Sequence, residues 1–360
     1  MDRIHRLALV LALSTVAGGA LSGCGRDNGT RPVRTAPPLP LHTWEDLGLT
    51  NGFAEVDALV SWNGKLVAGG TFFDAAGAAR SSLVQWDGAR WTLVGPQPSA
   101  DVLALTIYNG HLIAAGNFPQ IAGDTLRYVG EWDGAAWRPL GSGMDWTVLA
   151  LTVFNGDLVA AGVFAHAGGV PALHVARWDG STWHALGPGL DDAVWALAVY
   201  QGKLVAAGSF TFAGGTYVRR IATWDGATWA PLRYGLNGVA RSLWVHNDTL
   251  VVGGHFNDAD LSPARHVACW TGAKWDSLGA GLGDDDSEGV YSLTTYQGHL
   301  LAGGEFPGNI AERRAEYWLG LSYLNGYVNA MTVHEGRLVV GGYFPRTGGF
   351  STNGIARWVD

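Results

Sequence analysis

Short apolar segments separated by two-residue polar turns recur along most of the chain. One repeat shows the full unit: apolar runs over 148–154 and 158–164 flank a turn at Asn155-Gly156, and after a long loop, runs over 174–178 and 183–186 flank a turn at Asp179-Gly180. Asn-Gly and Asp-Gly between β-rich runs are strong hairpin signals, because turn residues there must tolerate positive φ angles. Each unit therefore predicts a sheet of four short antiparallel strands.

Two aromatic columns count the units. A phenylalanine after a pair of small residues ends the second run, at Phe72, Phe118, Phe164, Phe210, Phe256, Phe306 and Phe344. A tryptophan, followed four times by Asp-Gly, ends the third run, at Trp86, Trp132, Trp178, Trp224, Trp270, Trp318 and Trp358. A four-stranded unit that recurs after 46 residues, as from Phe72 to Phe118, is typical of a β-propeller blade. Both columns have seven members, so the sequence predicts seven blades.

The two ends of the repeat region predict a closed ring. The last unit stops just after Trp358, at the end of its third run, and the missing fourth run stands at the front, beginning with Trp44. An N-terminal strand that completes the C-terminal blade removes the two open sheet edges of a linear stack. In the sixth unit we place Trp318 in the third-run column and Tyr323 in the fourth, which predicts an irregular outer edge for that blade.

Several of these motifs resemble those of a known family. The small-residue pairs Ala161-Gly162 and Gly253-Gly254, the double glycines Gly168-Gly169 and Gly214-Gly215, and the paired aromatics across a glycine turn look like kelch-type propellers. They are still more similar to the Trp-Asp-Gly repeats of bacterial secreted proteins. The resemblance covers 41–360 and implies an all-β, seven-bladed β-propeller of four-stranded antiparallel blades, but it implies almost nothing about activity.

The first forty residues have the features of an export signal and a tether. Arg3 and Arg6 precede an apolar stretch over 7–17, and Leu21-Ser22-Gly23-Cys24 resembles the lipobox of bacterial lipoproteins. This predicts a signal peptide over 1–23, lipidation at Cys24, and a Pro-rich tether over 24–40. The protein would then be extracytoplasmic, at the outer membrane or cell surface, and held to the membrane by its N-terminal lipid alone. A plain secretory signal with a chance cysteine is the alternative.

Composition excludes some partners and cofactors. The net charge is −8, only 15% of the residues are charged, and the chain has no basic cluster, so we expect no binding to nucleic acid. The eleven histidines form no compact His-x-His or His-Glu-x-x-His pattern, so we expect no metal and no other cofactor. No set of residues indicates catalysis.

Candidate binding residues lie where the long connections meet the ring axis. Short hairpins occupy one face of the predicted ring, and the long loops occupy the other, where binding residues usually concentrate. Trp195 belongs to an innermost-strand column that is otherwise filled by Asp57, Leu103, Leu149, Arg241, Tyr291 and Asn329, a mixture unlike a packed core. The candidate ligand-binding residues are Trp146, Trp195, Tyr291, Arg219, Arg241 and His266. The aromatic ones either offer stacking surfaces to a sugar or an extended peptide, or fill gaps between blades.

The sequence favours a lipid-anchored binding scaffold for a protein, peptide or glycan, and we expect no enzymatic activity. The alternative is an extracellular hydrolase or lyase that acts on polysaccharide. A binding module predicts an exposed aromatic or apolar patch. An enzyme predicts convergent carboxylates or histidines with perturbed ionisation in the channel mouth.

Overall fold

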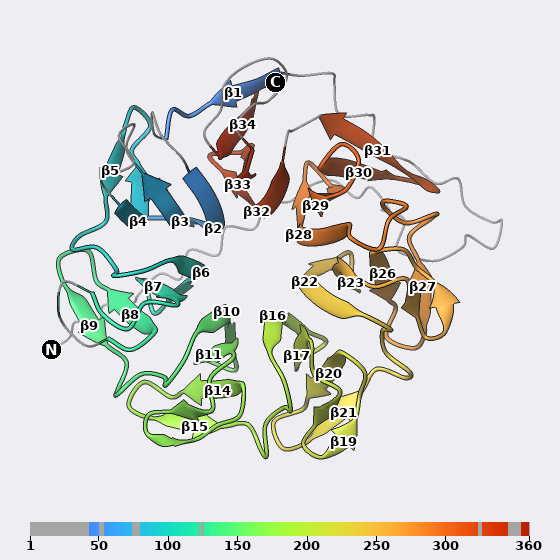
Figure 1. Cartoon of the computed structure of the whole chain (residues 1–360), viewed down its shortest axis with the longest axis horizontal. Helices are drawn as coiled ribbons and strands as arrows, with labels where there is room; N and C mark the ends of the chain where they lie inside the picture. The colour runs from blue at the N-terminus through green and yellow to red at the C-terminus, as the bar shows by residue number, and fades with distance from the viewer. Residues whose placement is uncertain are drawn as a thin grey trace, which may run out of the picture.

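The described part of the chain forms a closed ring of seven four-stranded antiparallel sheets. The computed structural model describes residues 43–49, 54–73, 80–121, 123, 126–322, 326–344 and 354–359. Its all-β, seven-bladed β-propeller confirms the predicted fold class (Figure 1). The predicted signal peptide, Cys24 and the tether lie outside the described residues. Within the described ranges no helix is long and apolar enough to cross a membrane.

Each blade is given from its innermost to its outermost strand. The first three blades are β2 (Ala54–Trp62), β3 (Lys65–Phe73), β4 (Arg80–Trp86), β5 (Trp91–Leu93); β6 (Val102–Tyr108), β7 (His111–Gly116), β8 (Val129–Trp132), β9 (Trp137–Pro139); and β10 (Val148–Phe154), β11 (Asp157–Gly162), β14 (Val175–Trp178), β15 (Trp183–Ala185). The next two are β16 (Val194–Tyr200), β17 (Lys203–Gly208), β20 (Ile221–Trp224), β21 (Trp229–Pro231); and β22 (Val239–His246), β23 (Thr249–His255), β26 (Val267–Trp270), β27 (Trp275–Ser277). The last two are β28 (Gly289–Tyr296), β29 (His299–Glu305), β30 (Ile310–Arg314), β31 (Tyr317–Ser322); and β32 (Tyr327–His334), β33 (Arg337–Tyr343), β34 (Ile355–Val359), β1 (Thr43–Asp46).

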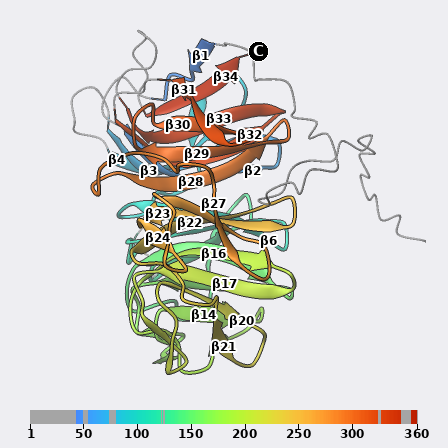
Figure 2. The same ribbon diagram turned by 90° about the vertical axis from the view of Figure 1, so that its right-hand side faces the viewer.

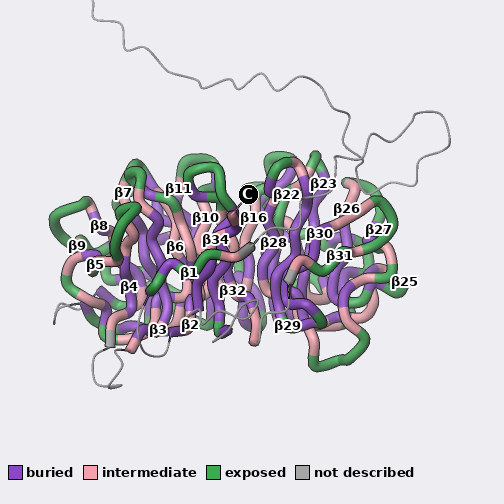
Figure 3. Tube along the Cα trace, turned by 90° about the horizontal axis from the view of Figure 1, so that it is seen from above, coloured by how far each residue is buried: buried purple, intermediate pink, exposed green. Residues whose placement is uncertain are grey.

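Among the described residues, three blades also carry a small two-stranded ribbon in the loop between their second and third strands. These ribbons are β12 (His166–Ala167) with β13 (Val170–Pro171), β18 (Phe212–Ala213) with β19 (Thr216–Tyr217), and β24 (Asp258–Ala259) with β25 (Ser262–Pro263). Seen edge-on, the strands of the blades run across the thickness of the ring (Figure 2). Buried strands fill the body of the ring and exposed turns line its two faces (Figure 3).

The two kinds of predicted hairpin turn differ in how they are built. In the first kind both residues have positive φ, 49° at Asn63 and 73° at Gly64, as the Asn-Gly signal predicts. In the second kind only the glycine does, with φ of 99° at Gly180. The carboxylate of Asp179 instead accepts hydrogen bonds from the backbone amides of Ser181 and Thr182, each at 2.8 Å. Our expectation of positive φ at both residues was therefore wrong for the Asp-Gly turns, because the aspartate closes the turn with its side chain.

The chain ends close the ring as the sequence predicts. Strand β1 pairs antiparallel with β34, with Trp44 opposite Trp358. Their ring centroids lie 4.8 Å apart in an edge-to-face arrangement. Beside them the Nη2 atom of Arg357 lies 2.7 Å from the Oε2 atom of Glu45. The N-terminal strand thus supplies the outer strand of the last blade.

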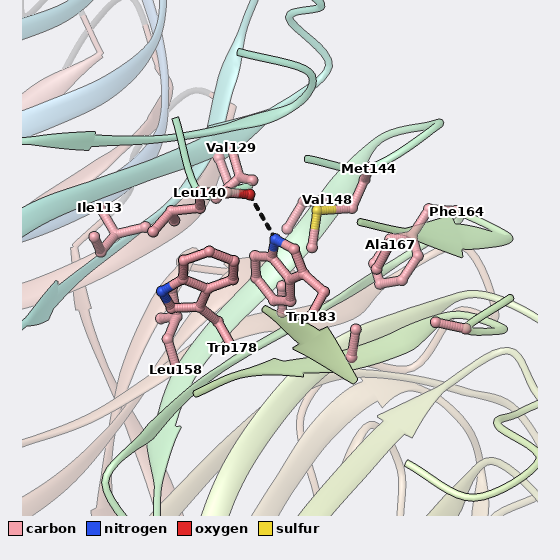
Figure 4. Packing of buried hydrophobic residues seen from close by; sticks show 14 of the residues in the cluster. Ile113, Val129, Leu140, Met144, Val148, Leu158, Phe164, Ala167, Trp178 and Trp183 are labelled. Atoms are coloured by element: carbon pink, nitrogen blue, oxygen red, sulfur yellow. Dashed lines mark hydrogen bonds between the residues drawn. The ribbon is translucent and has the colours of Figure 1, made fainter. Parts of the chain in front are cut away.

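The core lies between neighbouring blades, and tryptophans of the outer strands connect one blade to the one before it. Trp183 packs beside Phe164 and Met144, and its Nε1 donates to the backbone oxygen of Leu140 at 2.7 Å (Figure 4). The same bond recurs at 2.8 to 2.9 Å from Trp91 to Leu47, Trp137 to Pro96, Trp229 to Leu186, Trp275 to Leu232 and Trp318 to Leu278. Each indole buries a large apolar surface and satisfies a carbonyl at the same time.

That recurring bond corrects our placement of Trp318. Trp318 lies in the outermost strand of the sixth blade, opposite Arg313 of β30, and so belongs to the fourth-strand column. Arg313 takes the third-strand position that tryptophan holds in the other blades. The loop before β30 runs only from Phe306 to Asn309, which brings the third strand forward along the chain. Tyr323, which we assigned to the fourth column, lies outside the described residues and is not needed there.

Candidate functional site

Seven bulged residues form a ring around the propeller axis. In each innermost strand the pairing register shifts at one position, as between Val194 and Ala196 in β16. The bulged residues are Asp57, Leu103, Leu149, Trp195, Arg241, Tyr291 and Asn329, the mixed column found in the sequence. They are partly exposed, whereas Val194 and Ala196 beside Trp195 are buried. We call these seven residues the axial ring. A bulge re-aims a side chain out of the regular pleat, which explains why this column does not follow core composition.

Glycine in the second strand makes each bulge possible. A Cβ atom on Gly208 would overlap the backbone oxygen of Ala193, next to the bulge at Trp195. The glycines at the same position in the other blades stand against the equivalent carbonyls, at Gly70, Gly116, Gly162, Gly254, Gly304 and Gly342. The sequence has small residues before each phenylalanine because the bulged backbone of the innermost strand lies against the second strand at this point and leaves no room for a side chain.

Arg241 lies between two aromatic members of the axial ring. Its guanidinium carbon is 4.1 Å from the centroid of the Trp195 ring and 5.6 Å from that of Tyr291. The Nε1 atom of Trp195 donates to the hydroxyl of Ser209 at 3.1 Å, which fixes the indole plane. Burial lowers the pKa of Arg241, but guanidinium remains charged at any ordinary pH. The arrangement is a cation stacked between π-systems of blades four and six.

Tyr291 connects this cation to a histidine and a carboxylate. Its hydroxyl donates to Oε2 of Glu305 at 2.9 Å, and burial together with Glu305 raises its pKa, so it stays protonated. The His255 ring lies 5.4 Å from the Tyr291 ring. Burial, and then the charge of Arg241, lower the pKa of His255, so its imidazole is neutral at neutral pH. Gly289 leaves room for both rings, since a Cβ there would clash with His255 and Tyr291.

Carboxylates gather on the other side of the axial ring. Tyr327 donates its hydroxyl to Oε1 of Glu55 at 2.8 Å, and Asn329 donates its amide to Oδ1 of Asp57 at 2.9 Å. Asp101 accepts hydrogen bonds from the Thr71 hydroxyl and the Asn117 amide. Burial, reinforced by the charges of Glu55 and Asp101, raises the pKa of Asp57 to about 7. We call Glu55, Asp57 and Asp101 the acidic arc.

The structure brings half of the predicted site residues together. Trp195, Arg241 and Tyr291 are in contact in the axial ring. Trp146 is 58% exposed, and its ring lies 6.2 Å from that of Tyr128. The other two predicted residues lie in loops. Arg219 follows β19 and is partly buried, whereas His266 precedes β26 and is only 2% exposed, so it offers little surface to a ligand.

Several residues of this surface were absent from the sequence prediction. They include Glu55, Asp101, His255, Glu305 and Tyr327. A second mixed column would have found part of the set. The residue just before each phenylalanine varies as widely as the axial ring does: Thr71, Asn117, Val163, Ser209, His255, Glu305 and Tyr343. Among the described residues no group of three or more His, Cys, Asp or Glu is placed to hold a metal ion.

Comparison with known proteins shows the fold and nothing finer. No protein-family model and no curated protein matches the chain. The extracellular domain of a proposed hybrid two-component system, BT4673 of B. thetaiotaomicron, is similar with a TM-score of 0.61 and 9% identity over 88% of this chain. A second structure of the BT4673 extracellular domain gives 0.60 and 9% over 88%. This chain spans only 39% and 40% of those two chains. The computationally designed Ika8 protein is similar with a TM-score of 0.50 and 15% identity, over 87% of this chain and 99% of that one.

Proposed function

We propose that the protein is an extracytoplasmic binding scaffold whose axial ring takes a glycan, peptide or protein ligand. The observation that carries the proposal is the stack of Trp195, Arg241 and Tyr291 at re-aimed, partly exposed positions. The residues on either side of the bulge at Trp195, Val194 and Ala196, are by contrast small, aliphatic and buried. Aromatic faces and an arginine held on a rigid frame suit stacking and polar recognition. The likeness to extracellular domains of BT4673 supports an extracytoplasmic location.

The proposal includes anchoring through a lipid on Cys24. The lipobox-like sequence Leu21-Ser22-Gly23-Cys24 supports it, together with the Pro-rich tether that would hold the ring away from the membrane. In cells fed labelled palmitate, the wild-type protein should be labelled and a Cys24→Ala protein should not. Equal labelling of both would disprove the anchor.

Ligand capture by the axial ring is tested with two single variants and one control. Trp195→Ala and Tyr291→Ala each remove an aromatic face beside Arg241. Tyr317→Ala removes an exposed tyrosine of the outer strand β31, far from the innermost strands. On a glycan and peptide array, the first two variants should lose signals that the wild type and Tyr317→Ala share. Unchanged signals in both axial variants would show that these rings only fill space between blades.

A second candidate, an extracellular polysaccharide hydrolase or lyase, is favoured by one observation. The acidic arc brings three carboxyl groups together, and a carboxyl group whose pKa is about 7 suits general acid or base catalysis at neutral pH. Each carboxyl group is, however, already engaged by a neighbouring side chain. Release of reducing sugar from bacterial or plant polysaccharides by the wild type, and its loss in Asp57→Asn, would favour this candidate over the scaffold.

A further inference from the structure

Arg241 is a partly buried positive charge with no negative partner in the described residues. Its Nε atom is buried and makes no hydrogen bond. Two other partly buried arginines of the ring do have carboxylate partners: Arg177 pairs with Asp157 at 2.6 Å and Arg314 with Glu312 at 2.7 Å. Glu305, the carboxylate beside Tyr291, accepts a hydrogen bond from the hydroxyl of Tyr291 and makes no ion pair with Arg241. In this chain of net charge −8, the missing counter-ion is not explained by a shortage of acids.

Nε of Arg241 is buried, but its two Nη atoms make no hydrogen bond with the described residues, so their N–H groups remain available to a ligand. Trp195 covers one flat face at 4.1 Å, so the ring stabilises the cation through its π-system without using an N–H group. The N–H donors of guanidinium lie in its plane, where their fork matches the two oxygens of a carboxylate. Buried charges in proteins are normally paired, because an isolated one is costly. A site that keeps such a cation unpaired is prepared for a negative charge from outside the chain.

We propose that Arg241 binds a single carboxylate of an acidic saccharide. The inference rests on the proposed function, since it names the ligand chemistry of the same axial ring. Tyr291, Tyr327 and Tyr343 continue the aromatic cluster beside Arg241, with centroid separations of 6.2 and 5.6 Å, and an aromatic face of this kind can stack against the apolar face of a sugar ring.

The acidic arc limits how much negative charge a ligand that binds the axial ring can carry. Asp57 lies in the first blade and Arg241 in the fifth, and Glu55 and Asp101 lie close to Asp57. These carboxylates repel a ligand with many negative charges. They also accept hydrogen bonds from sugar hydroxyls. The surface therefore selects a saccharide with one carboxylate at Arg241 and neutral hydroxyls toward the acidic arc.

Matched small ligands test this assignment. Methyl glucuronoside and methyl glucoside share one ring and differ in a carboxylate, so their binding to the full chain is compared by calorimetry or ligand-observed NMR. The glucuronoside should bind at least about tenfold more tightly, and Arg241→Gln should remove that preference. Arg138→Gln, at an exposed arginine of the outer strand β9, should keep it. No glucuronoside binding, equal binding of the two glycosides, or an unchanged preference in Arg241→Gln would overturn the proposal.

Two further measurements separate this proposal from its alternatives. N-Acetylglutamate carries a carboxylate without a sugar ring, and binding equal to that of the glucuronoside would overturn the saccharide class. Without ligand, Arg241→Met should melt at the same temperature as the wild type or higher, because it removes an unpaired buried charge and keeps the stem. A clearly lower melting temperature would show that Arg241 serves the fold. If Trp195→Ala loses array ligands that Arg241→Gln retains, the proposed function stands and the carboxylate assignment fails.

Discussion

At the scale of single residues, the Asp57 carboxyl group is held in a position that disfavours its charge. The strand places it at a bulge, where burial and the nearby carboxylates of Glu55 and Asp101 raise its pKa to about 7. The amide of Asn329 opposes this effect, but it offsets only part of the cost. The same position in the fifth blade holds Arg241, so one column of the ring carries an acidic and a basic group, and neither has an oppositely charged partner among the described residues.

The raised pKa of Asp57 predicts a loss of stability as the pH rises. The unfolded carboxyl group titrates near 3.8 and the folded one at about 7, so the folded state binds the proton more tightly. The penalty is absent below the unfolded pKa, grows between the two values, and is complete above about 7, where it reaches roughly 4 kcal/mol at most. Asp57→Asn should therefore raise the free energy of unfolding by a few kcal/mol at about pH 8 and by less at about pH 5. Urea denaturation at both pH values checks this, and an equal gain at both would contradict it.

At the scale of strands and blades, the sixth blade differs from what the sequence predicts, because Trp318 lies in its fourth strand and not in its third. Trp318 donates to the carbonyl of Leu278 just as Trp183 donates to that of Leu140, although its Trp-Leu-Gly context looks like the third-strand motif. The indole N–H of Trp178, a third-strand tryptophan, makes no hydrogen bond with the described residues. Trp318→Phe and Trp183→Phe should each leave a buried carbonyl without its hydrogen-bond donor and lower the free energy of unfolding by about 1–3 kcal/mol. Trp178→Phe should lower it by less. Chemical denaturation of the three variants measures this, and a loss for Trp318→Phe no larger than that for Trp178→Phe would contradict the stabilising role of the bond to Leu278.

The sequence predicts the strand positions of a blade correctly where the turn motifs and the repeat spacing indicate the same positions. It predicts them wrongly where a loop differs in length from that of the other blades. Seven phenylalanines and the Asn-Gly turns fix strand order, because each marks a fixed point of the sheet. The short loop from Phe306 to Asn309 shifts the third strand of the sixth blade without changing either the phenylalanine or the turn. The axial ring shows a similar limit: its column is visible in the sequence, but the bond from Tyr291 to Glu305 joins two strands and needs their register. Burial of His266 in a loop is likewise decided by packing.

At the scale of the whole molecule, closure by β1 predicts a sharp boundary for N-terminal truncation. A protein that begins at residue 41 keeps Trp44 against Trp358 and Glu45 against Arg357, so it should melt as the wild type does. A protein that begins at residue 50 leaves β34 as an open edge and exposes Trp358, which is only 2% accessible in the ring. We expect it to melt at a lower temperature and to associate, because unpaired strand edges add strands from other chains. Thermal melting with sedimentation velocity distinguishes the two proteins. A truncated chain from residue 50 that stays monomeric and equally stable would mean that the ring does not depend on its N-terminal strand.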